Sequence, residues 1–144
     1  MASTTEERLT GGSLSAAISN AIVRIMAEYT GRGPTKARTS IRDDLVVVLM
    51  QETLTKAERS LFAAGQHDFV LETRKRHQNT MREDFVAAVQ MLTERKVIAF
   101  MSANHMQPDM AAEIFVLEPG SQGDRREGDA DALTASEPAG SPDG

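Results

Sequence analysis

The first periodic stretch of the chain lies near its N-terminus and has the spacing of an amphipathic helix. Its apolar side chains recur every three or four positions, along one side of a helix: Leu14, Ile18, Ile22, Ile25 and Tyr29. Ser13 is a suitable N-cap for this helix. Gly31 is a suitable exit, because glycine adopts a left-handed conformation without strain. The pattern predicts a helix from about residue 13 to residue 30.

The next two stretches have the period of strands. Polar and apolar residues alternate over residues 36–42, so that each kind occupies one face. Residues 45–50 are apolar at every position and rich in valine, which is typical of a strand covered on both faces. The Asp43-Asp44 pair between them suits a tight turn. Together the two stretches predict a β-hairpin.

Two helical segments are predicted next. Thr55 and Glu58 have the spacing of a capping box, in which each side chain accepts a hydrogen bond from the other residue's backbone N–H. The short helix that they open ends at Gly65. A long helix is then predicted over about residues 66–95, although residues 72–80 in its middle offer almost nothing to a core. Thirty helical residues would span about 45 Å, against about 20–27 Å for the strands. This helix therefore either overhangs the sheet or breaks in two.

A second hairpin is predicted from residues 96–102 and 111–118, joined by a loop that contains Pro108-Asp109. The order of elements is helix, two strands, two helices, two strands. This order indicates the α+β class, with an antiparallel four-stranded sheet built from two hairpins. The N-terminal helix and the long central helix are expected to pack on that sheet.

The second hairpin is apolar on both faces. In its first strand, strict alternation places Val97, Ala99 and Met101 on one face and Ile98 and Phe100 on the other. Helices on only one side would leave a large exposed apolar patch, which is unusual in a monomer. Either a helix covers each side or a second copy covers one. We favour a homodimer, because symmetric self-association is the commonest way to bury such a face.

Composition divides the chain into one domain and two tails. A length of 144 residues suits a single domain, and the absence of cysteine excludes disulfides and thiolate zinc sites. Residues 119–144 are rich in Gly, Ser, Pro and Asp and hold six acids and two bases, so most of the net charge of −5 lies there. This acidic tail and residues 1–12 are predicted to be disordered, because they bury too little apolar surface. The domain is expected to cover residues 13–118.

The N-terminus does not have the charge and apolar pattern of a signal peptide. No apolar stretch approaches the roughly 20 residues that span a bilayer. These features predict a soluble, cytoplasmic protein without direct membrane insertion.

No residue pattern points to catalysis or to a metal. His67, His77 and His105 lie on separate predicted elements, without ligand spacing. The Asp43-Asp44 pair is interpreted as a turn, since adjacent strand residues point to opposite faces. Neither a nucleophile elbow nor a phosphate-binding glycine loop is present. We therefore expect no catalytic residue, no metal and no cofactor, and a protein that is not an enzyme.

A basic segment follows the first helix. Four cations and no acid occupy residues 32–42: Arg32, Lys36, Arg38 and Arg42. Alternation sets the last three along one edge or face, and arginine suits paired hydrogen bonds to phosphate or carboxylate. Backbone N–H groups around Gly31 and Gly33 suit an anion-binding nest. The four cations and Gly33 are therefore the candidate residues for binding an anion or a partner.

Two uses of this basic charge remain open at the level of sequence. The cations either bind an anionic group or simply solvate an outer strand and discourage edge pairing. A second basic run, Arg74-Lys75-Arg76, lies in the polar middle of the long helix and is interpreted as a solvated face.

Several short motifs resemble those of the MpsC family, a bacterial family named as a component of a sodium-translocating, membrane-potential-generating system. The motifs are Gly31-Arg32-Gly33-Pro34 with Lys36 and Arg38, Asp44-Leu45, Leu54-Thr55-x-x-Glu58, Arg95-Lys96-Val97 and Glu113-x-Phe115-Val116-Leu117. The resemblance covers residues 13–118. It implies an association with membrane ion transport, and it transfers no catalytic residue to this chain.

Three functional interpretations follow. The first is a non-catalytic accessory or regulatory protein that binds a protein partner, in a membrane cation-transport system as the resemblance implies. The alternative is a nucleic-acid or phosphate-anion binding module that uses residues 31–42, although the near-neutral domain and the lack of an aromatic platform weigh against nucleic acid. The third, an enzyme for an anionic small molecule, would need a buried general acid or base near Gly33, and the sequence nominates none.

Overall fold

The computed structural model of this chain describes residues 10–34 and 36–120. Its elements are α1 (Gly11–Thr30), β1 (Lys36–Arg42), β2 (Leu45–Gln51), α2 (Lys56–Ala63), α3 (His67–Thr93), β3 (Val97–His105) and β4 (Met110–Leu117). The strands form one antiparallel sheet in the order β1-β2-β4-β3. The predicted α+β class and order of elements are confirmed. The predicted tails, 1–12 and 119–144, lie for the most part outside the described residues.

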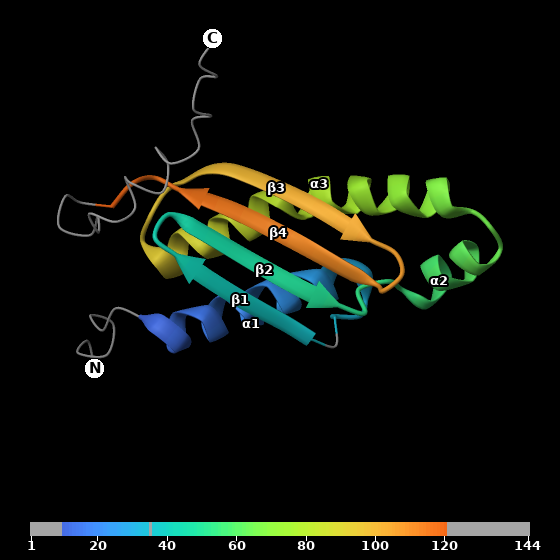
Figure 1. The fold of residues 1–144 in the computed structure, drawn as a ribbon, viewed down its shortest axis with the longest axis horizontal. Coiled ribbons are helices and arrows are strands. Elements are labelled where there is room, and N and C mark those ends of the chain that lie inside the picture. Colours follow the sequence, from blue (N-terminus) through green and yellow to red (C-terminus); the bar gives the residue numbers. More distant parts are fainter. Residues whose placement is uncertain (1–9, 35, 121–144) are drawn as a thin grey trace, which may run out of the picture.

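The fold has two layers, a sheet and a layer of helices. Figure 1 looks onto the sheet, with α1 and α3 behind it. Residues on the helix side of β2 and β4 alternate along each strand and are all buried: Val46, Val48, Met50, Ala111, Glu113, Phe115 and Leu117. The apolar ones pack against buried residues of the two long helices: Ile18, Ile22, Ile25 and Met26 of α1, and Met81, Phe85 and Val89 of α3. The core therefore lies on one side of the sheet, which we call the inner face.

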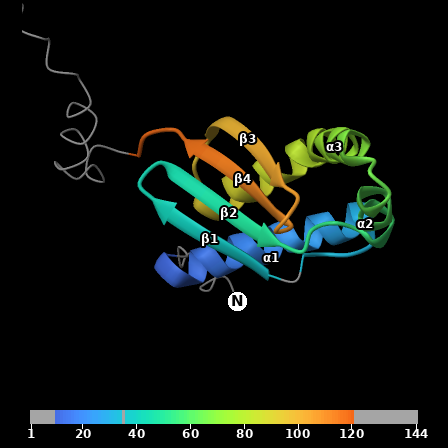
Figure 2. The same ribbon diagram turned by 45° about the vertical axis from the view of Figure 1, so that its right-hand side comes forward.

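The long helix is continuous and overhangs the sheet. α3 runs for 27 residues without a break, and its N-terminal end extends past the ends of the strands (Figure 1). Figure 2 shows α2 lying beside this overhanging end. Of the two predicted alternatives, overhang is the correct one.

The reason for this continuity is a buried stripe that runs the whole length of α3. Its members are Val70, Arg74, Gln78, Met81, Phe85, Val89 and Thr93. The prediction that residues 72–80 offer almost nothing to a core is therefore wrong for Arg74 and Gln78. Because these two polar side chains find partners inside the protein, the stripe has no gap at which the helix would have to break.

Most predicted helix ends are correct. Gly31 ends α1 with φ 77°, and its N–H donates to the Ala27 carbonyl oxygen at 2.9 Å. The capping box is present at α2, with Glu58 N–H bonded to Thr55 Oγ1 at 3.1 Å and Thr55 N–H bonded to Glu58 Oε1 at 2.9 Å. The predicted start of α1 is wrong, since the helix begins at Gly11 with Thr10 as its N-cap and Ser13 lies within the first turn.

The predicted alternation of β3 is wrong at its start. The register shifts between Val97 and Ala99, because a bulge at Ile98 inserts one residue into the strand. Val97 therefore pairs with Leu117 and packs on the core on the same side as Phe100, whereas Ile98 is 57% exposed. Ala99 and Met101 lie on the opposite, outer face, as predicted.

Candidate functional site

Three of the predicted binding residues form a row on the outer face of the sheet. Alternate residues of β1, namely Ala37, Thr39 and Ile41, pair with buried, inward-pointing residues of β2, so Lys36, Arg38 and Arg42 point to the other side, as does Ser40. All three are exposed. We call them the basic row. The alternation in the sequence was sufficient to place them together.

Two of the predicted binding residues lie apart from the basic row. The Arg32 guanidinium donates a hydrogen bond from Nη1 to the Leu54 carbonyl oxygen at 3.4 Å, so this side chain contacts the loop before α2. Gly33 lies against α1, where an added Cβ would come within 3.0 Å of Val23 Cγ1. The glycine thus has a packing reason to be there. A binding role for Arg32 and Gly33 stays a prediction.

The basic row borders an open hollow of about 460 Å³. Lys36, Ala37 and Arg38 of β1 line it together with Leu49 and Gln51 of β2. Its size is within the range of small-ligand sites. Two cations and an amide beside an apolar side chain would suit an anionic group with an apolar attachment, such as an acidic peptide side chain.

Next to the basic row, the outer face is apolar. The strand register assigns nine apolar residues to it: Leu45, Val47 and Leu49 of β2, Ala112, Ile114 and Val116 of β4, and Ala99, Met101 and Ala103 of β3. We call these nine residues the outer patch. None of them is buried, and Leu45 and Met101 are 41% and 50% exposed. No helix within residues 10–34 and 36–120 covers this side (Figure 1).

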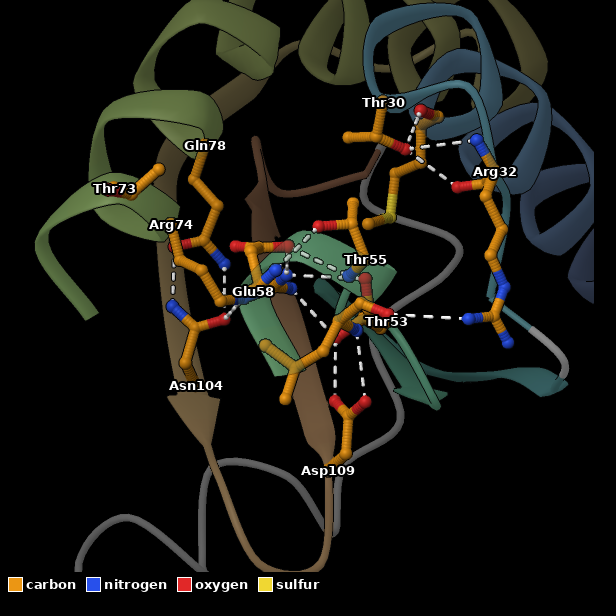
Figure 3. A network of polar contacts seen from close by, with 12 residues as sticks. Thr30, Arg32, Thr53, Thr55, Glu58, Thr73, Arg74, Gln78, Asn104 and Asp109 are labelled. Atoms are coloured by element: carbon orange, nitrogen blue, oxygen red, sulfur yellow. Dashed lines mark hydrogen bonds and ion pairs between the residues drawn. The ribbon is translucent and has the colours of Figure 1, made fainter. Parts of the chain in front are cut away.

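A second polar cluster, which the sequence did not reveal, lies on the inner side and is centred on Arg74 (Figure 3). Although it belongs to a basic run, Arg74 is only 6% exposed. Its guanidinium donates from Nε to Asn104 Oδ1 at 3.0 Å, from Nη1 to Glu58 Oε1 at 3.3 Å and from Nη2 to Thr53 Oγ1 at 2.7 Å. A fourth bond runs from Nη1 to the Thr53 carbonyl oxygen at 3.3 Å. The interpretation of Arg74 as a solvated face is therefore wrong, whereas Lys75 and Arg76 are exposed as expected.

Asp109 ties the loop before α2 to the β3–β4 hairpin (Figure 3). Its carboxylate accepts from Thr53 Oγ1 and from the Leu54 N–H, both at 2.9 Å. Its carbonyl oxygen accepts from the Glu52 N–H at 3.0 Å. Because Thr53 also bonds Arg74, this loop is held from two sides.

The cluster also includes Glu113 of β4. Gln78 Nε2 donates to Glu113 Oε1 at 3.2 Å, and Ser102 Oγ is hydrogen-bonded to Glu113 Oε2. Gln78 and Asn104 also exchange hydrogen bonds with each other, at 2.8 and 3.2 Å. Burial raises the pKa of Glu113 to about 7, against the opposing effects of the Ser102 and Gln78 bonds and the charge of Arg74. With 1% of its surface exposed, this carboxyl group is inaccessible to a ligand.

We call the cluster around Arg74 the inner network; its members are Thr53, Glu58, Arg74, Gln78, Ser102, Asn104, Asp109 and Glu113. Two signals in the sequence could have located it. Arg74 and Gln78 follow Val70 at steps of four, on the same side of the helix as Met81. Glu113 lies on the inner side of β4, between Ala111 and Phe115. The network joins α2, α3 and both strands of the second hairpin, and its buried groups have a structural role.

The described residues carry no sign of a metal site or of a membrane span. No three His, Asp or Glu side chains among them are grouped closely enough to hold a metal ion. His67 is stacked on Phe62, and His105 Nδ1 lies 2.8 Å from the Pro108 carbonyl oxygen. None of the helices in residues 10–34 and 36–120 is both long and apolar enough to cross a bilayer.

Comparison with known families decides the identity of the domain. Residues 10–119 match the family described as "Na+-translocating membrane potential-generating system (MpsC)". The chain belongs to the MpsC family. The MpsC match includes every helix and strand, and therefore the basic row, the outer patch and the inner network. No curated protein and no solved structure gives a significant match.

Proposed function

We propose that this MpsC-family protein is a non-catalytic accessory or regulatory component of a Na⁺-translocating, membrane-potential-generating system, and that its basic row binds an acidic segment of a protein partner. The single observation that carries the proposal is the exposed basic row on a face of the sheet whose strand positions hold no acid. Family membership supplies the biological setting.

The charge on this face supports a binding role. The residues opposite Lys36, Arg38 and Arg42 on β2 are Gln51, Leu49 and Leu45, none of which is charged. The outer positions of β3 and β4 hold no carboxylate either. Within the strands, the outer positions therefore place no carboxylate opposite the cations, and an acidic segment laid along β1 would supply the opposite charge.

The lining of the hollow supports the absence of catalysis. Among the described residues, the five that line it include no carboxylate, no histidine and no hydroxyl group. The one described carboxyl group whose pKa is raised to near neutrality, that of Glu113, points to the inner face and is buried. The site offers charge and shape for binding, and Lys36 is the one side chain of a usual general acid–base type among its described lining residues.

The proposal is tested by affinity purification from native cells. Wild-type protein is compared with an Arg38→Ala, Arg42→Ala double variant, and Arg76→Ala serves as the matched control, because Arg76 is an exposed cation on α3. We expect a membrane-transport subunit to co-purify with the wild type and the control, and to be lost from the double variant. Identical partners from all three proteins would overturn the proposal.

Two further variants extend this experiment. Arg32→Ala tests the residue that lies apart from the row: loss of the same partner would place Arg32 in the binding surface, and retention would leave it with its contact to Leu54. A Leu49→Ala variant changes the apolar wall of the hollow without altering any charge. A smaller loss with Leu49→Ala than with the double variant would show that charge dominates recognition.

A phosphate-anion or nucleic-acid ligand is the second candidate, and the hollow between Lys36 and Arg38 is the observation that favours it. Binding of inorganic phosphate and of a short single-stranded RNA is measured with purified protein at increasing salt. Affinity that falls steeply with salt and disappears in the double variant would support this candidate. Salt-independent retention, or none at all, would exclude it.

A further inference from the structure

The geometry points to a homodimer in which the outer patches of two copies pack face to face, with the two-fold axis parallel to the strands. In this arrangement β1 of each copy lies across β3 of the other. The inference rests on the outer patch and does not depend on the accessory role proposed above.

The outer face of the sheet, which comprises the outer patch and the basic row, is large enough for a specific interface. Its four strands, about 4.8 Å apart and about seven residues long, cover on the order of 450 Å². Side-chain relief increases the accessible area, so two faces together would bury roughly 1,000 Å² or more, the lower range of specific interfaces. A contiguous apolar patch of a few hundred Å² is about the largest that a typical monomer exposes, and such patches often mark interaction sites.

The patch is also suited to a copy of itself. The register aligns its residues in rows across the sheet, so that every row crosses all four strands. Its centre, on β2 and β4, is apolar and holds no buried polar group that a particular partner would have to satisfy. Sheets that pack face to face lie about 10 Å apart, with mean strand directions within about 30° of each other.

The basic row selects one of the two simple orientations. A two-fold axis across the strands would place β1 on β1 and bring Lys36, Arg38 and Arg42 of both copies together, with no acid on either face. Such like-charge contact is costly. An axis parallel to the strands places the row over the outer residues of β3 in the second copy, at the rim of the interface, where the long side chains reach water.

In the favoured orientation the apolar residues of the two central strands oppose one another in the same rows. The facing pairs are Leu45 with Val116, Val47 with Ile114, and Leu49 with Ala112. At one edge, Ser40 of each copy lies over Met101 of the second copy, because both share the row of Val47 and Ile114. The hollow beside Lys36 and Arg38 then lies near Ala103 and His105 of the second copy.

The first test is the oligomeric state of the purified full chain, measured by light scattering and sedimentation at micromolar concentration. We expect a dimer for the wild type. Ile114→Glu places a charge at the centre of the outer patch and should raise the dimer Kd by on the order of a hundredfold or more. Met91→Glu is the matched control, because Met91 is 73% exposed on α3 and lies outside the patch. This control should remain a dimer.

Circular dichroism shows whether each variant is folded, so that loss of the dimer can be distinguished from unfolding. A folded monomeric Ile114→Glu protein beside a dimeric Met91→Glu protein supports the proposal. A monomeric wild type would overturn it. A dimer that survives Ile114→Glu would overturn it too, because another surface would then form the interface.

The second test is cross-linking, for which the natural absence of cysteine is an advantage. Single variants Ser40→Cys and Met101→Cys are treated with a short bismaleimide, separately and as an equal mixture. We expect cross-linked dimers from the mixture and little product from either variant alone. Strong self-cross-linking of Ser40→Cys would overturn the orientation, since it would place β1 on β1.

Discussion

The two basic runs of this chain occupy opposite environments. Arg38 lies in the first run, is exposed on β1, and points to the outer face of the sheet, where the strand positions hold no acid. Arg74 lies in the second run, on α3, and donates four hydrogen bonds inside the protein. Both residues are arginines with a basic residue two positions away, so local composition does not separate them.

This comparison shows how the surroundings of an arginine determine its role. A guanidinium can be buried only where acceptors bond its N–H groups and an acid balances its charge. Arg74 finds these partners inside the protein, so its charge is not available to a ligand. An exposed guanidinium keeps its charge available to a ligand, and removing it costs the fold little. The inner network should therefore control stability, and the basic row should control binding.

The largest effect is expected from Arg74→Ala. It would leave Glu58 as a buried carboxylate without its cation and would remove two bonds to Thr53. Breaking a buried pair in this way costs about 3–5 kcal/mol of unfolding free energy. Urea denaturation measures the loss. Lys75→Ala, at the exposed neighbouring position, should change stability by less than about 0.5 kcal/mol. A loss below about 1 kcal/mol for Arg74→Ala would remove the distinction between the two regions.

The next effect concerns pH and Glu113. Its pKa is raised from 4.5 to about 7 in the folded protein, so the folded state favours the neutral acid. The resulting stabilisation is complete below the unfolded pKa and is lost as the pH rises through the folded pKa, a span worth on the order of 3 kcal/mol.

Glu113→Gln measures this contribution, because an amide keeps the hydrogen bonds with Gln78 and Ser102 and carries no charge. Chemical denaturation of both proteins at pH 5, 6, 7 and 8 should show the variant gaining stability relative to the wild type as the pH rises. Parallel curves for the two proteins would show that Glu113 does not titrate in this range.

An intermediate effect is expected from Asp109→Ala. The Leu54 N–H and the Thr53 hydroxyl would lose their acceptor, at a cost of about 1–3 kcal/mol. Double-mutant denaturation with Arg74→Ala should give less than the sum of the two single losses, because both residues hold Thr53. Strict additivity would mean that the inner network is not one unit.

The smallest effect on stability is expected from Arg38→Ala. Arg38 is exposed on a strand, so the free energy of unfolding should change by less than about 0.5 kcal/mol. Binding of the partner, measured in the same protein, should nevertheless fall. A large loss of stability would mean that the basic row stabilises the sheet. That result would favour the alternative in which the cations solvate an outer strand and bind no partner.

Much of the fold was predictable because short-range rules determine it. The range of β1 follows from alternation, the α2 start follows from the spacing of Thr55 and Glu58, and the α1 end follows from Gly31. The bulge at Ile98 was not predictable, since it depends on how β3 pairs with β4 and not on the composition of β3.

The candidate site was predictable in part. Alternation along one strand placed Lys36, Arg38 and Arg42 together, and the structure keeps them together. It did not show that Arg32 turns toward Leu54, because that contact joins positions 22 residues apart in the chain.

By itself, the sequence determined the elements, their order and the face on which the exposed cations of β1 lie, because periodicity and capping act over a few neighbouring residues. Only the tertiary structure decided which polar groups could be buried. Arg74 is buried because α2, the loop before it and β3 supply acceptors from 16 to 30 residues away. A charged side chain enters a core only where such partners converge, and their convergence is a property of the folded chain.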